Sequence, residues 1–71
     1  MTTFRVRFRG HYPDEHHVEY LQELGDFASW RQLGPSEYLL IPHRANKIAL
    51  VRDDLLRQQD RRELFFEEIE E

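Results

Sequence analysis

The chain has 71 residues, with 10 basic and 14 acidic side chains, four histidines and no cysteine, so its formal net charge is −4. A single domain of about this size buries only roughly 60% of the surface that its unfolded chain exposes, and without cysteine neither a disulfide nor a thiolate-bound metal adds stability. No apolar run is long enough to cross a membrane and the arginine-rich start does not resemble an export signal, so we expect a cytoplasmic protein with no membrane partner.

Residues 3–9 alternate between apolar and basic side chains, which predicts a strand with one apolar face. The two sets point to opposite sides of this strand: Phe4, Val6 and Phe8 against Arg5, Arg7 and Arg9. Pro13 followed by two acidic residues predicts the start of a helix over residues 14–24. Gly25 is expected to form the C-terminal cap of that helix.

Two aromatic and aliphatic runs, residues 27–33 and 37–41, are separated by Gly34, Pro35 and Ser36, which predicts a hairpin. Apolar residues recur every three or four positions over residues 45–59, which predicts a second helix. A polar break at residues 60–62 precedes a final strand, rich in aromatic residues, from Leu64. The alternative assigns residues 47–51 to a strand and 53–70 to one long helix, but that helix would have no apolar residue over residues 57–63.

The order strand, helix, strand, strand, helix, strand predicts an α+β fold of the ferredoxin-like type over residues 1–71, taken as one domain. In this fold two helices cover one face of a four-stranded antiparallel sheet, the first and third strands are central, and the other face is open. The third strand is apolar on both sides, and the fourth carries Phe65 and Ile69 on the side away from Leu64 and Phe66. The open face therefore mixes arginines with large apolar side chains, a pattern typical of an interface, and we expect a homodimer.

The residues expected to bind a partner lie on the first, third and fourth strands: Arg5, Arg7, Arg9, Tyr38, Leu40, Phe65 and Glu67. In one interpretation the fourth strand lies antiparallel to the first, and Glu67 or Glu68 pairs with the arginines across the strands. In the other, the arginines contact phosphates or an acidic partner. Five of the residues 63–71 are glutamates that can neutralise the arginines, which favours a protein partner over nucleic acid.

The residue types that carry chemistry form no recognised motif. His16 and His17 are adjacent, and neighbours on a helix point about 100° apart, so they do not easily share one metal ion. We therefore expect surface histidines, no metal and no cofactor. Ser29 and Ser36 have no evident base nearby, and the pair Asp53 and Asp54 is expected to be solvated. The sequence predicts a protein that is not an enzyme.

Four stretches, residues 3–6, 24–25, 36–40 and 63–69, resemble the small Cas2-like proteins, which include short SinR-like relatives. The resemblance spans nearly the whole chain and implies a ferredoxin-like protomer that dimerises through its sheets. In active members of the family it also implies metal-dependent nuclease chemistry, which uses an acidic residue at the end of the first strand. Arg9 stands at that position here, and because an arginine cannot ligate Mg²⁺, we expect the scaffold without the nuclease activity.

These observations favour a non-catalytic interaction module, a dimeric Cas2-like scaffold that binds a macromolecular partner through its open face or an edge strand. One alternative is an acidic inhibitor, similar to an antitoxin, whose Glu-rich C-terminal strand occupies the basic nucleic-acid-binding surface of a target protein. The other alternative is a divergent metal-dependent nuclease.

Overall fold

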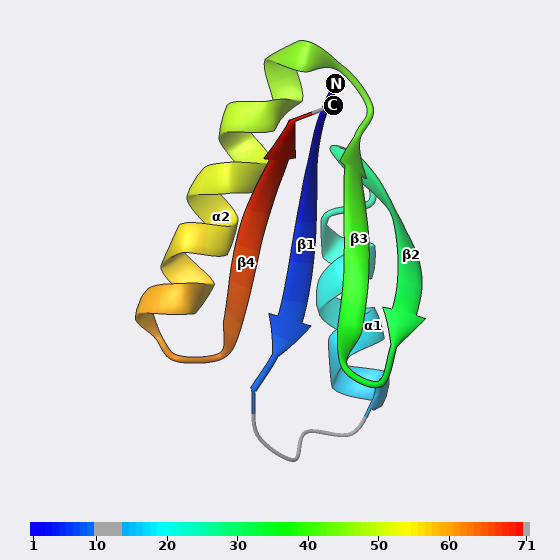
Figure 1. Ribbon diagram of the computed structural model, residues 1–71, viewed down its shortest axis with the longest axis vertical. Coiled ribbons are helices and arrows are strands. Elements are labelled where there is room, and N and C mark those ends of the chain that lie inside the picture. Colours follow the sequence, from blue (N-terminus) through cyan, green and yellow to red (C-terminus); the bar gives the residue numbers. More distant parts are fainter. Residues whose placement is uncertain (10–13, 71) are drawn as a thin grey trace.

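The computed structural model describes residues 1–9 and 14–70, with the side chains of residues 14 and 15 left out. The elements follow the predicted order: β1 (Thr2–Phe8), α1 (Asp14–Glu23), β2 (Ala28–Gly34), β3 (Glu37–Pro42), a short 3₁₀ helix η1 (Ala45–Lys47), α2 (Ile48–Asp60) and β4 (Leu64–Glu70). The strands form one antiparallel sheet in the order β2-β3-β1-β4, and both helices lie on the same face of it (Figure 1). The fold is therefore α+β with βαββαβ topology, as predicted, and the alternative with one long C-terminal helix is wrong.

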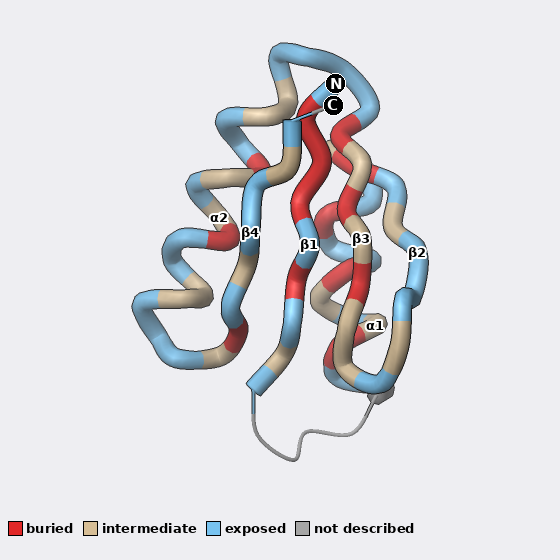
Figure 2. The backbone as a smooth tube through the Cα atoms, viewed as in Figure 1, coloured by how far each residue is buried: buried red, intermediate tan, exposed pale blue. Residues whose placement is uncertain are grey.

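The alternation along β1 determines which face of the sheet packs against the helices. Phe4 and Val6 are fully buried, whereas Arg5 and Arg7 are exposed. Buried and exposed positions alternate along this part of β1 (Figure 2), as expected for a strand with one covered face. The buried apolar cluster draws on all four strands, on both helices and on the turn after α1: Phe4, Val6, Leu21, Leu24, Ala28, Tyr38, Leu40, Val51, Leu55 and Leu64. The core therefore lies in a single layer between the sheet and the two helices, and the opposite face is open.

Gly25 follows α1 but does not adopt the left-handed backbone that a glycine cap ordinarily uses. Its N–H donates to the carbonyl of Gln22 at 3.0 Å, within a turn over residues 24–27. A Cβ at this position would lie 3.0 Å from the same carbonyl oxygen, so the close backbone approach favours glycine here. Left-handed backbone occurs instead at Ser36, with φ 60°, and at Arg62, with φ 61°.

The sheet brings the two ends of the chain together. Strand β1 pairs with β4 over its whole length, from Thr2 opposite Glu70 to Phe8 opposite Leu64. The Thr2 hydroxyl donates to the Glu70 carboxylate, and the termini lie side by side at one end of the sheet (Figure 1). No helix in the described part of the chain is long and apolar enough to cross a membrane.

Side chains cap backbone groups on both edge strands of the sheet. On β4, the Phe66 N–H donates to Gln59 Oε1 of α2 at 3.4 Å. On β2, the register shifts between Gln32 and Gly34, and Gln32 Nε2 donates to the Gly34 carbonyl at 3.2 Å. Irregular or covered edges are poor templates for pairing with another chain, so these contacts make the edges less able to recruit one.

Candidate interaction surface

The side chains of the open face are arranged in rows across the strands. Residues that are partners in an antiparallel register lie side by side on the same face of the sheet. The first row pairs Thr3 with Ile69 and Ser29 with Ile41, the second contains Glu67, Arg5, Leu39 and Arg31, and the third contains Phe65, Arg7 and Glu37. The face therefore changes from uncharged near the chain termini to charged near the β2–β3 turn.

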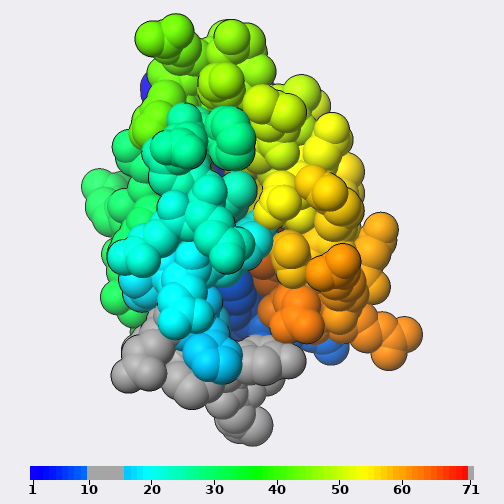
Figure 3. Space-filling model, turned by 180° about the vertical axis from the view of Figure 1, so that it is seen from behind, coloured from blue at the N-terminus to red at the C-terminus, as the bar shows by residue number. Residues whose placement is uncertain are grey.

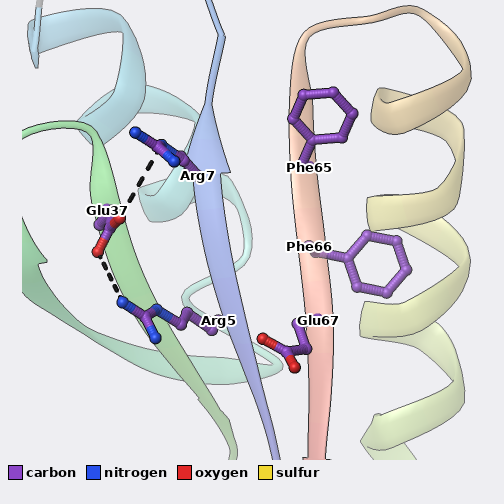
Figure 4. Close-up of a pocket in the computed structure, with 6 residues that line it drawn as sticks. All are labelled: Arg5, Arg7, Glu37, Phe65, Phe66 and Glu67. Carbon is purple, nitrogen blue, oxygen red and sulfur yellow. Dashed lines mark hydrogen bonds and ion pairs between the residues drawn. The ribbon is translucent and has the colours of Figure 1, made fainter.

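Glu37 of β3 contacts two arginines of the open face. It accepts a hydrogen bond from Arg5 Nη2 at 3.1 Å and lies 3.9 Å from Arg7 Nε (Figure 4). Glu67 stands opposite Arg5 on β4, as one of the two predicted cross-strand pairs requires. Glu68 points to the helix-covered face instead, where it pairs with Arg52 at 2.6 Å. The acidic C-terminal strand therefore divides its charges between the two faces.

Phe65 stands beside a shallow hollow in the charged part of the open face. Its side chain is exposed, and the Arg9 guanidinium lies 4.6 Å from the centre of its ring, a cation–π contact. The hollow has a volume of about 270 Å³ and is lined by six residues: Arg5, Arg7, Glu37, Phe65, Phe66 and Glu67 (Figure 4). Four of these lining residues belong to the predicted binding set, and Arg9, a fifth member, lies over Phe65. Arginine, glutamate and aromatic side chains therefore meet at one place.

Tyr38 and Leu40 do not belong to this surface. They are the register partners of Val6 and Phe4, face the helices, and have exposed fractions of 1% and 0%. Their inclusion among the binding residues is therefore corrected, because both lie in the core. A strand that is apolar on both sides does not reveal which side the helices cover, and in this fold Leu39 presents the outward side of β3.

Two of the histidines differ in burial. His16 is exposed, but His17 is buried and its ring stacks on Phe8 with 4.2 Å between the centroids. The expectation of surface histidines is therefore wrong for His17, which packs as a core aromatic; His11 lies outside the described residues. Among the residues that the structure describes, no group of three or more histidine, cysteine or acidic side chains is placed to hold a metal ion.

Ser29 has a base nearby, contrary to the sequence expectation. Its Oγ lies 3.0 Å from Nε2 of His43, and both residues are exposed. The sequence carries no signal for this contact, because the two residues are 14 positions apart and meet only when β2 pairs with β3. A catalytic serine also needs a group that orients its histidine and donors that stabilise an oxyanion. On its own, the pair links β2 to the segment after β3.

Asp54 joins the two helices. Its Oδ2 accepts a hydrogen bond from the Tyr20 hydroxyl at 2.5 Å, and its Oδ1 accepts one from Arg57 at 3.4 Å. Burial raises the pKa of the Tyr20 phenol, and the hydrogen bond to Asp54 and the charges of Asp54 and Glu23 raise it further. The expectation of a solvated pair therefore holds for the exposed Asp53 but is wrong for Asp54, which is half-buried.

Comparisons with known proteins leave the open face to be interpreted from its own residues. No family model matches the chain, and neither the curated proteins nor the solved structures include a match. The structure establishes the ferredoxin-like topology, whereas the resemblance to Cas2-like proteins stays an expectation.

Proposed function

We propose that the protein is a cytoplasmic, non-catalytic interaction module with a Cas2-like scaffold, which forms a homodimer through the open face of its sheet. One observation carries this proposal: large apolar side chains stand among arginines and glutamates on the face opposite both helices. Phe65 is 51% exposed there, and Leu39, Ile41 and Ile69 are half-buried in the other two rows. Apolar side chains gathered in this way and bordered by polar groups are typical of interaction surfaces.

The edges of the sheet are less suited to association than its open face. The Phe66 N–H on β4 is already bonded to Gln59, and β2 has an irregular register near Gly34. Strand β4 also carries Glu67, Glu68 and Glu70, so pairing of two β4 strands would bring like charges together. These features favour packing of sheet against sheet over extension of the sheet by another strand.

The mixed charge of the open face favours a second copy of the chain as its partner. Arg5, Arg7 and Arg31 lie on this face together with Glu37 and Glu67. A surface that carries both signs can be matched by its own copy around a two-fold axis. Association would also bury apolar surface that the single chain leaves exposed, as at Phe65.

The two alternatives have less support. An acidic inhibitor would present the glutamates of β4 together, but Glu68 is bonded to Arg52 and Glu70 to Thr2 on the other face. A nuclease similar to the Cas2-like enzymes would need an acidic residue where Arg9 stands over the Phe65 ring. A further protein partner, bound by the dimer, is part of the proposal, and nucleic acid binding is an outcome of the test below.

Light scattering after size exclusion, at micromolar concentration, tests the homodimer. The expected mass is twice the chain mass of 8.7 kDa for the wild type and a single chain for Phe65→Asp. Leu56→Asp is the matched control, because Leu56 is a similarly exposed apolar residue on α2, with 41% exposed. It should leave the dimer intact.

A monomeric wild type would overturn the proposal. Fluorescence anisotropy with a labelled single-stranded oligonucleotide then distinguishes the remaining possibilities. If the monomeric wild type binds the oligonucleotide and the Arg5→Gln, Arg7→Gln double variant binds it at least about tenfold more weakly, the open face is a nucleic-acid-binding surface and not a dimer interface. Equal affinities of the wild type and the double variant for the oligonucleotide would exclude the open face as the nucleic-acid-binding site.

A further inference from the structure

A cleft opens between α1 and the C-terminal part of α2, on the side of the molecule away from the open face (Figure 3). Its volume is about 140 Å³. The lining residues that matter here come from four elements and the turn before β4: Phe8, His17, Tyr20, Gln58, Glu63 and Leu64. The cleft is therefore built by the helix layer and is separate from the surface proposed for dimerisation.

The walls of the cleft are aromatic and held in place. The Phe8 ring stacks on His17 at 4.2 Å, and the Tyr20 ring meets Phe8 edge-on, with 6.0 Å between centroids and 82° between planes. The Tyr20 hydroxyl is fixed by its hydrogen bond to Asp54. An apolar protein cavity of about 150 Å³ is large enough for benzene. The cleft therefore has room for a group of about that size.

The charge around the cleft is negative on two sides. Glu63 supplies a half-buried carboxylate to the lining, and Gln58 supplies an amide. Helix α1 also places His16, which is exposed, and the buried His17 in the lining. The charges of Asp54 and Glu23 reach Tyr20, where they help to raise the pKa of the phenol against the opposing charge of Arg57. These groups favour a positively charged occupant.

We propose that this cleft binds a small organic cation, an ammonium or guanidinium group on an apolar stem. Aromatic rings attract such cations through their negative faces, and a carboxylate adds a charged partner. The stem would pack on Phe8 and Leu64, and the charged head would pair with Glu63. The cation has two possible sources with the same chemistry, a free amine or a lysine or arginine side chain of a partner protein.

Amide chemical shifts of the full chain test the site with three ligands of one size: n-butylammonium, 1-butanol and butyrate. We expect n-butylammonium to give saturable shifts at Phe8, Tyr20 and Leu64, with a dissociation constant of order 1 mM. Butanol should bind more weakly and butyrate not at all. An equal response to all three ligands, or no saturable response at these residues, would overturn the proposal.

Glu63→Gln should weaken n-butylammonium about two- to fivefold and leave 1-butanol unchanged, as expected for a solvent-accessible ion pair. Glu67→Gln on the open face is the matched control and should change neither affinity. Equal n-butylammonium affinities in the wild type and Glu63→Gln would overturn the role of the carboxylate. Gln58→Phe, which fills the cleft from α2, should abolish the shifts. Its mass in light scattering should equal that of the wild type, so the cation site and the homodimer are tested separately.

The tripeptide acetyl-Gly-Lys-Gly-amide distinguishes the two sources of the cation. Binding at least as tight as that of n-butylammonium would support a side chain of a partner protein. Binding of n-butylammonium without binding of the tripeptide would support a free amine. Both results support a cation site, whereas the absence of both would overturn it.

Discussion

The two faces of the sheet use the same strands for different purposes. On the covered face, Tyr38 and Val6 are register partners with 1% and 0% of their surfaces exposed, and aromatic rings meet edge-on around Tyr38. One residue further along β3, Leu39 lies on the open face beside Arg5, and charged pairs replace aromatic contacts. The open face is therefore not simply an uncovered part of the core, because its charged groups are arranged in rows and some of them form ion pairs.

The faces also differ in charge. The open face holds four arginines, Arg5, Arg7, Arg9 and Arg31, against the two glutamates Glu37 and Glu67. Among the described residues, basic side chains therefore outnumber acidic ones on this face, although the whole chain has 10 basic and 14 acidic residues. The net charge of −4 therefore does not describe this face.

The largest expected effect compares neighbours on β3. Tyr38→Ala should lower the free energy of unfolding by about 3–5 kcal/mol, because it empties part of the core, whereas Leu39→Ala should cost about 1 kcal/mol or less. Urea denaturation of both variants measures the difference. If Tyr38→Ala does not fold, Leu40→Val provides a milder change on the covered face, with an expected loss of about 1 kcal/mol. Equal losses of unfolding free energy in Tyr38→Ala and Leu39→Ala would contradict the difference between the covered and the open face.

A smaller effect is expected from the contact between the helices. Tyr20→Phe removes the hydrogen bond to Asp54 and should lower the free energy of unfolding by about 1 kcal/mol at pH 7. The raised pKa of Tyr20 means that the unfolded chain loses this proton at a lower pH than the folded chain. Stability should therefore fall as the pH rises above about 10, the ordinary tyrosine value, and fall less steeply in Tyr20→Phe. Parallel pH dependences of the two proteins, measured by urea denaturation, would rule out this linkage.

The smallest effect concerns the two carboxylates of the open face. Glu37 contacts Arg5 and Arg7, whereas Glu67 is placed opposite Arg5 by the register. Glu37→Gln should cost about 0.5 kcal/mol and Glu67→Gln less, since exposed ion pairs contribute little. Both losses should shrink in high salt, which thermal unfolding at two ionic strengths can show. A larger loss for Glu67→Gln would mean that β4 and not β3 supplies the main partner of the arginines.

The sequence predicts the covered face of β1 well and that of β3 poorly. Strict alternation in β1 leaves one choice of face, so Phe4 is in the core and Arg5 is outside, as predicted. In β3 every residue from Tyr38 to Ile41 is apolar, and only the register with β1 shows that Tyr38 is covered and Leu39 is open. Periodicity carries no information about the partner across the sheet when both sides of a strand are apolar.

Contacts between distant segments account for the rest of what the sequence does not predict. Glu37 follows a turn and looks like an ordinary hairpin residue, but pairing of β3 with β1 places it opposite Arg7. The contacts of Ser29 with His43 and of Tyr20 with Asp54 likewise depend on packing between elements, at separations of 14 and 34 residues. The residues of the candidate site could be predicted where the alternation within one strand places them on the open face. They could not be predicted where their position depends on pairing between two strands.

The pairing of β1 with β4 also shapes the route by which the chain reaches this fold. Thr2 and Glu70 are neighbours in the sheet although 68 positions separate them, so the central strand completes its pairing only after the longest loop in the protein has closed. Closing a long loop costs conformational entropy before the contact stabilises the chain. A short linker between the paired ends of β1 and β4, with new ends cut at the β2–β3 turn, would make β1–β4 a hairpin and β2–β3 the pairing of longest range. The two faces of the sheet would be unchanged, while the pairing that closes the longest loop would move from one edge of the sheet to the other.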